Sequence, residues 1–90
     1  MLLQGKKAIV TGGTRGIGFA VVQTFLRNGA SVALFGSRQE TVDKALAALK
    51  EENPDWEVIG MAPDLTDYAA VDAAFAEVEK AFGRIDILVN

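Results

Sequence analysis

Residues 11–18, Thr-Gly-Gly-Thr-Arg-Gly-Ile-Gly, decide the fold expected for this chain. They follow the short β-branched run of residues 7–11, which predicts a buried strand, and they precede residues 17–28, whose apolar side chains recur at helical spacing. Glycine permits the positive φ angles of a tight strand-to-helix turn, and its missing Cβ lets a ligand approach the main chain. Because the first amides of a helix attract anions, the segment predicts a turn that binds a diphosphate.

The rest of the chain alternates short strand-like runs with longer helical ones. Further strands are expected at residues 31–35, within 56–62 and at 85–89, and further helices from Ser37 to the break at 53–55 and from about 67 to 82. Ser37 and Glu40 have the spacing of a capping box at the start of the second helix. The order βαβαβαβ needs crossover connections, so it predicts an α/β fold with a doubly wound parallel sheet and helices on both faces.

Length, charge and composition restrict the class of function. Ninety residues allow one domain, and nine basic against twelve acidic residues give a net charge of −3, so we expect no nucleic-acid partner. The chain has no Cys and no His, which excludes disulfide, thiolate, Zn–Cys and histidine chemistry within it. No apolar run has the length of a membrane span, and we expect a cytoplasmic protein with no membrane partner and no metal.

Two well-known phosphate loops do not fit the glycine turn. Gly13 and Gly18 have P-loop spacing, but Phe19 stands where that loop needs lysine. No three glycines follow the G-x-G-x-x-G pattern. The pattern that fits is T-G-x-x-x-G-x-G over residues 11–18, and it resembles the cofactor motif of classical short-chain dehydrogenases/reductases.

Two further stretches extend this resemblance. Asp64-Leu65, after the third strand, is similar to the family's adenine-facing Asp-Val/Leu pair, and residues 86–90 are similar to the start of its D-I-L-V-N-N-A-G stretch. The resemblance implies a Rossmann-type fold with strand order 3-2-1-4, of which residues 1–90 form the dinucleotide-binding N-terminal part of a single, here truncated, domain. Together with the anion-binding argument it implies cofactor contacts by Gly12, Thr14, Arg15, Gly16, Ile17, Gly18, Asp64, Leu65 and Asn90.

Some of these residues have other interpretations. Glycines between a strand and a helix suit any tight turn. Asp64 could instead cap the third helix, in competition with Thr66 or Asp67. Asn90 could be an ordinary loop residue rather than a neighbour of the adenine-side ribose.

The end of the second strand indicates which dinucleotide is preferred. An acidic residue there would bind both ribose hydroxyls and repel a 2′-phosphate, which selects NAD. This chain has Gly36-Ser37-Arg38 instead, and a guanidinium binds phosphate through two parallel hydrogen bonds. Because Arg15 could approach the same phosphate from the other side, we predict a preference for NADP(H) over NAD(H). The alternatives are that both arginines are solvated and that Ser37 also caps the helix.

The resemblance implies an oxidoreductase that moves hydride between nicotinamide and a carbonyl or alcohol, as in 3-oxoacyl-carrier-protein reductases and bacterial hydroxysteroid dehydrogenases. It places the family's Ser, Tyr-x-x-x-Lys and Asn downstream. Tyr68 is followed four residues later by Asp72, so we expect no catalytic residue in this segment. The full-length protein would be a homo-oligomer acting on a small molecule. The alternatives are a non-catalytic dinucleotide sensor or scaffold, and a flavodoxin-like or response-regulator domain, which would leave the glycine turn and Arg38 unexplained.

Overall fold

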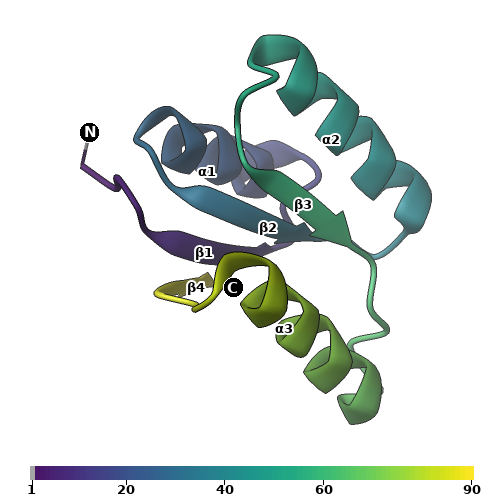
Figure 1. The fold of residues 1–90 in the computed structure, drawn as a ribbon. Coiled ribbons are helices and arrows are strands. Elements are labelled where there is room, and N and C mark those ends of the chain that lie inside the picture. Colours follow the sequence, from purple (N-terminus) through teal and green to yellow (C-terminus); the bar gives the residue numbers. More distant parts are fainter. Residues whose placement is uncertain (1) are drawn as a thin grey trace.

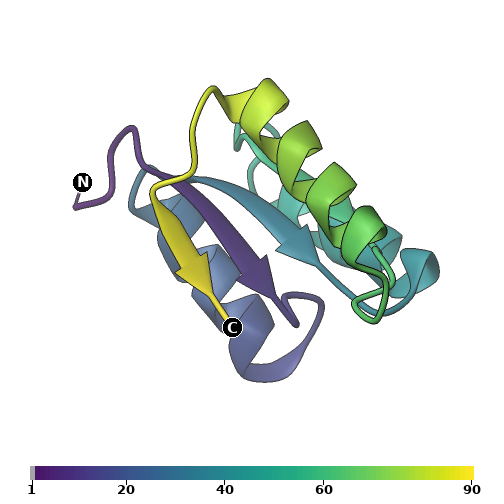
Figure 2. The same ribbon diagram turned by 90° about the horizontal axis from the view of Figure 1, so that it is seen from below.

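The computed structural model describes residues 2–90 and arranges them as a parallel sheet between two layers of helices (Figure 1). Its elements are β1 (Lys7–Thr11), α1 (Gly16–Arg27), β2 (Ser31–Phe35), α2 (Gln39–Glu52), β3 (Val58–Met61), α3 (Tyr68–Phe82) and β4 (Ile87–Val89). The strands lie in the order β3-β2-β1-β4 and all pairs are parallel. Helices α1 and α2 cover one face and α3 covers the other (Figures 1 and 2). The predicted doubly wound α/β fold and its strand order are confirmed.

The alternation of side chains along the central strands divides the core into two layers. In β1, Ala8 and Val10 pack toward α1 and α2, whereas Ile9 packs toward α3. All five residues of β2 are buried, because it lies between β1 and β3 with helices on both faces. A fully buried aliphatic side chain contributes about 1.5–3 kcal/mol. The central strands therefore form the centre of the core, and the loops that follow their carboxyl ends are built on them.

The helix boundaries follow the expected ones closely. Helix α1 starts at Gly16 and buries Val22 and Leu26, but Ile17 is 86% exposed and does not belong to the apolar stripe. Asp67 is the N-cap of α3: its carboxylate accepts hydrogen bonds from the amides of Ala69 (3.0 Å) and Ala70 (3.4 Å). Of the candidates for this cap, Asp67 is therefore the one that caps α3, and Asp64 is not.

The capping box predicted for Ser37 and Glu40 is wrong. Helix α2 begins at Gln39 with Arg38 as its N-cap, and within residues 2–90 no side chain makes a cap hydrogen bond there. Thr41 Oγ1 donates to the Arg38 carbonyl oxygen instead (3.0 Å). Ser37 lies one residue too early to cap the helix, because the backbone is still extended at Arg38. This leaves the Ser37 side chain free to face a ligand.

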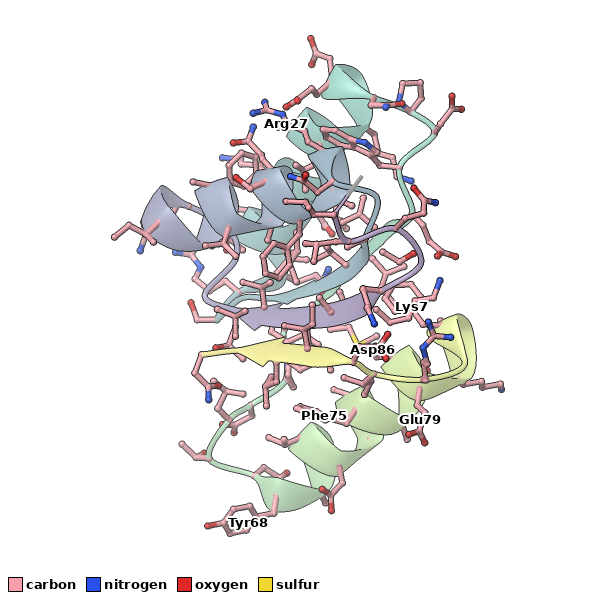
Figure 3. All side chains as sticks on the ribbon, turned by 90° about the vertical axis from the view of Figure 1, so that its left-hand side faces the viewer. Lys7, Arg27, Tyr68, Phe75, Glu79 and Asp86 are labelled. Atoms are coloured by element: carbon pink, nitrogen blue, oxygen red, sulfur yellow. The ribbon has the colours of Figure 1, made fainter. Side chains whose placement is uncertain are left out.

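Strand β4 is shorter than expected because Asp86 pairs with β1 through its side chain. The Asp86 carboxylate accepts from the Lys7 amide (2.9 Å), and the Asp86 amide donates to the Lys7 carbonyl (2.7 Å); Figure 3 shows the two residues side by side. Regular pairing with β1 starts at Ile87. Leu88 in β4 is 49% exposed. No helix within residues 2–90 combines the length and apolar character needed to cross a bilayer.

Candidate cofactor site

The glycine turn joins β1 to α1 through residues 12–15. Its backbone conformation requires glycine at the first residue of the turn and at the first residue of α1. Gly12 (φ 67°) and Gly16 (φ 62°) lie in the left-handed region, where side chains with a Cβ are strained. An added Cβ at either position would face open space within the described part of the chain, so the requirement is conformational rather than steric. Between them Arg15 is extended (φ −162°) and forms the N-cap of α1. The turn thus presents bare main chain beside the first amides of a helix.

Two further glycines are required by close packing. A Cβ on Gly18 would lie 1.9 Å from the Gly12 carbonyl oxygen, so the first turn of α1 rests directly on the loop. A Cβ on Gly13 would lie 2.9 Å from Leu34 Cβ in β2. The Gly13 amide also donates to the Phe35 carbonyl oxygen (3.2 Å). These contacts hold the turn against the sheet and fix where the amides of α1 begin.

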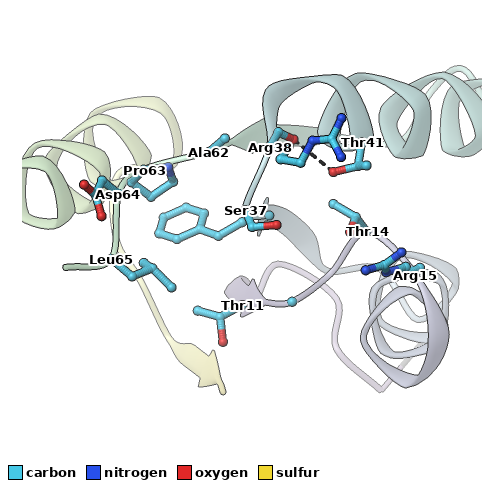
Figure 4. Close-up of a pocket in the computed structure, with 13 residues that line it drawn as sticks. Thr11, Thr14, Arg15, Ser37, Arg38, Thr41, Ala62, Pro63, Asp64 and Leu65 are labelled. Carbon is cyan, nitrogen blue, oxygen red and sulfur yellow. Dashed lines mark hydrogen bonds between the residues drawn. The ribbon is translucent and has the colours of Figure 1, made fainter. Parts of the chain in front are cut away.

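A hollow of about 580 Å³ lies at the carboxyl ends of the strands, in front of this turn (Figure 4). It is lined by Thr11, Gly12, Thr14, Arg15, Phe35, Gly36, Ser37, Arg38, Thr41, Ala62, Pro63, Asp64 and Leu65. Its volume is typical of a small-molecule or cofactor site. It also lies where the strand order reverses, since β1 is flanked by β2 on one side and β4 on the other, and ligands bind at such points in open α/β sheets.

Eight of the twelve residues predicted to contact a cofactor line this hollow: Gly12, Thr14, Arg15, Gly36, Ser37, Arg38, Asp64 and Leu65. The other four lie beside it. Gly16, Ile17 and Gly18 form the first turn of α1. Asn90 is next to the lining residue Thr11, whose Oγ1 donates to Asn90 Oδ1 (3.4 Å) and to the Val89 carbonyl oxygen (3.2 Å).

Five lining residues were not among the predicted contacts, and one of them, Thr11, belongs to the glycine motif itself. Phe35, Ala62 and Pro63 lie at the ends of β2 and β3, and Thr41 lies in the first turn of α2. For the residues at the strand ends a usable signal was present, because the carboxyl ends of parallel strands converge on one edge of a sheet. Every residue that follows a predicted strand was therefore a candidate for this edge.

Charged groups divide the hollow into two ends. Arg15 and Arg38 lie at one end, on either side of Thr14, and Asp64 lies with Leu65 at the other (Figure 4). Asp64 accepts hydrogen bonds from the Thr66 hydroxyl (2.6 Å) and the Thr66 amide (2.9 Å). These two bonds, the hydroxyl first, lower the pKa of Asp64 below its ordinary value, so the carboxylate stays charged. One end therefore suits an anion, and the other offers an acceptor for N–H donors.

The residues present fit a dinucleotide. At the end of β2, a Cβ on Gly36 would lie 2.5 Å from Thr14 Cγ2 and 2.8 Å from Val42 Cγ2, so only glycine lets the two loops approach this closely. The bare main chain and the helix start suit a diphosphate, and guanidinium groups suit a further phosphate.

Tyr68, 87% exposed at the start of α3, points away from the sheet (Figure 3). Within residues 2–90 there is no cluster of three potential metal ligands.

Comparisons with known proteins point to one family. The family model described as short chain dehydrogenase matches residues 6–90. A 3alpha-hydroxysteroid dehydrogenase of Mediterraneibacter gnavus is 60% identical over 90 residues, which is 100% of this chain and 36% of that enzyme.

Solved structures agree with this match. The crystal structure of an NAD⁺-bound xylitol dehydrogenase has a TM-score of 0.89 at 31% identity, over 98% of this chain and 33% of the other. The 2-keto-3-deoxy-D-gluconate dehydrogenase of Streptococcus agalactiae has a TM-score of 0.89 at 36% identity, over 98% of this chain and 32% of the other. The chain therefore spans about a third of the length of these relatives.

Proposed function

Because the chain belongs to the short-chain dehydrogenase family, we propose that it is the cofactor-binding portion of an oxidoreductase that prefers NADP(H) to NAD(H). The observation that supports this choice is the pair of arginines, Arg15 and Arg38, lining one end of the same hollow. Strand β2 ends at Phe35 and is followed by Gly36 and Ser37, without the carboxylate that would repel a 2′-phosphate. One relative of the same fold is described as NAD⁺-bound, so we assign the choice to these side chains and not to the fold.

The residues of this chain would bind and orient the cofactor. The amides of the turn and of the start of α1 hold the diphosphate, and Gly18 keeps that helix close enough to reach it. Ser37 and Arg38 donate hydrogen bonds to the 2′-phosphate, with Arg15 opposite.

At the other end of the hollow, Asp64 accepts from the adenine amino group and Leu65 covers the ring, while Asn90 lies toward the adenine-side ribose. The bound dinucleotide supplies or takes up the hydride. Holding the adenosine half and the diphosphate restricts where the nicotinamide can lie relative to a substrate, and such positioning lowers the entropic cost of the reaction.

The proposed substrate is a small carbonyl compound or the corresponding alcohol, such as a hydroxysteroid or a 3-oxoacyl thioester. The 60% identity to a hydroxysteroid dehydrogenase supports the first of these. The proposal includes a cytoplasmic homo-oligomer. Its serine and Tyr-x-x-x-Lys groups, implied by the resemblance, would provide the proton donor at the carbonyl oxygen.

The cofactor preference is tested by reversing the charge of Arg38. In the full-length protein, fluorescence titration should show a lower Kd for NADPH than for NADH. Arg38→Asp should remove about 1.5–3 kcal/mol of NADPH binding and reverse the order of the two cofactors. Lys80→Asp, the same charge change on the exposed side of α3, is the control and should leave both constants unchanged. Equal constants for the two cofactors in the parent protein would refute the assignment.

A further inference from the structure

One carboxylate on α2 contacts two cations beside the proposed phosphate site. Glu40 Oε2 lies 3.3 Å from Arg38 Nη2, and Glu40 Oε1 lies 3.7 Å from Lys44 Nζ. We propose that Glu40 is a specificity-determining residue that competes with the 2′-phosphate for Arg38 and so weakens the preference for NADP(H). The inference rests on the proposed function, since it concerns the same site.

The Arg38 nitrogen that Glu40 contacts is one that a bound phosphate would also use. A guanidinium that binds phosphate through two parallel hydrogen bonds uses a pair of its nitrogens, and Nη2 belongs to both the end-on and the side-on pair. Glu40 occupies this Nη2. Because Nη2 carries two N–H groups, one in each pair, Glu40 blocks one of the two edges of the guanidinium, and the phosphate has to displace it there or use the other edge.

The exposure of the pair allows this exchange. The side chains of Arg38 and Glu40 are 68% and 64% exposed, so water screens their attraction. Such surface ion pairs contribute little free energy. A phosphate with a charge near −2 and three acceptor oxygens is the stronger partner. The competition therefore reduces the affinity for the phosphate without abolishing it.

Glu40 also has an unfavourable charge at this place. Arg15 and Arg38 line the cofactor hollow, and Lys44 lines an adjoining hollow of about 350 Å³ between α1 and α2, which Arg15 lines too. Glu40 is the acidic residue of the first turn of α2, within this group of cations. Once the phosphate has bound Arg38, the carboxylate is left near a like charge, with Lys44 as its remaining partner. Both effects of Glu40 act against the 2′-phosphate and leave a free ribose hydroxyl unaffected.

The test is a comparison of ligands that differ in the 2′-phosphate. Kd values of the full-length protein are measured for NADPH, NADH, adenosine 2′,5′-bisphosphate and AMP. Glu40→Gln should bind NADPH and the bisphosphate about two- to fivefold more tightly, with NADH and AMP unchanged. Glu51→Gln, the same charge change in the last turn of α2, is the matched control and should change none of them. In an Arg38→Gln background the gain from Glu40→Gln should be largely lost.

The outcomes separate this inference from the proposed function. If the parent prefers NADPH but Glu40→Gln leaves its Kd unchanged or raises it, Glu40 does not compete and the inference is overturned, while the proposed function stands. An equal gain for NADH and NADPH also overturns it, because the charge would then act on the diphosphate. If the parent shows no preference for NADPH, the proposed function fails and this inference fails with it. Thermal unfolding of each variant checks that the fold is unchanged.

Discussion

At Gly18 the main chain of α1 passes so close to the preceding loop that a Cβ would lie 1.9 Å from the Gly12 carbonyl oxygen. Gly12 differs, because there the positive φ of 67° is the constraint and the space beside it is open. Both glycines belong to one motif, yet one is required by contact and the other by conformation. This difference predicts how each will respond to substitution.

Gly18→Ala should destabilise the full-length protein by about 1–3 kcal/mol and weaken dinucleotide binding, because α1 has to move away from the turn. Chemical denaturation and a cofactor titration measure the two effects. At Gly12, asparagine should be tolerated better than alanine, since asparagine adopts left-handed conformations more readily. At Gly18 asparagine should be at least as harmful as alanine. If alanine is accepted at Gly18 without loss, the close packing described here is wrong.

At the level of elements, the starts of α2 and α3 can be compared, because the sequence offers a capping candidate at each: Ser37 for α2 and Asp67 for α3. Asp67 caps α3 through the amides of Ala69 and Ala70, whereas Ser37 lies outside α2. Asp67→Ala should cost about 1 kcal/mol of folding stability, and Asp67→Asn should retain most of it. Ser37→Ala should change stability by less than about 0.5 kcal/mol. Urea unfolding of the full-length variants measures both changes in stability. An equal loss of stability for Asp67→Ala and Ser37→Ala would contradict the helix starts described here, in which only Asp67 caps a helix.

The alternation of elements could be predicted from the sequence because each strand and helix has its own hydrophobic period. The failures lie at element boundaries, where tertiary contacts decide. Ser37 has the right spacing to Glu40, but α2 starts two residues after it. Asp86 fits the strand pattern in the sequence, but the Lys7 amide donates to its carboxylate and not to a main-chain carbonyl of β4. Ile17 fits a helical stripe, but the stripe of α1 faces the sheet and Ile17 faces away, 86% exposed.

The candidate site was predictable where it depends on local patterns. The glycine turn, Ser37-Arg38 and Asp64-Leu65 could be identified because each follows a predicted strand directly. Thr41 could not, since it reaches the hollow only through the direction in which α2 leaves the sheet. The contact of Glu40 with Arg38 depends on side-chain conformation and likewise follows from the structure alone.

At the level of the whole molecule, the end of the sheet opposite the hollow is held by a polar network. Asp86 accepts from the Lys7 amide and from Arg84 Nε (3.0 Å), which joins β4 to β1. The Lys7 amide and then Arg84 lower the pKa of Asp86 below its ordinary value. A carboxyl whose pKa is lower in the folded than in the unfolded state stabilises the fold above its unfolded pKa, and this contribution is lost as the pH falls through the folded value.

Asp86→Asn should therefore lower stability at pH 7, and the difference from the parent should shrink as the pH falls below about 4. Urea unfolding of the full-length protein at steps from pH 7 to about pH 2.5 measures this difference. Asp72→Asn, on the exposed side of α3, is the control for the change of charge. A difference that stays constant over this range would show that the Asp86 charge does not hold β4.

The sheet brings three loops together at one edge, and the central claim is that these loops hold NADP(H) in a defined orientation. A crystal structure of the full-length protein with NADPH tests this most directly. We predict the diphosphate within hydrogen-bonding distance, about 2.7–3.2 Å, of main-chain amides in residues 12–18, and the 2′-phosphate in contact with Arg38. A nucleotide bound elsewhere, or a 2′-phosphate that faces solvent away from both Arg15 and Arg38, would contradict the account.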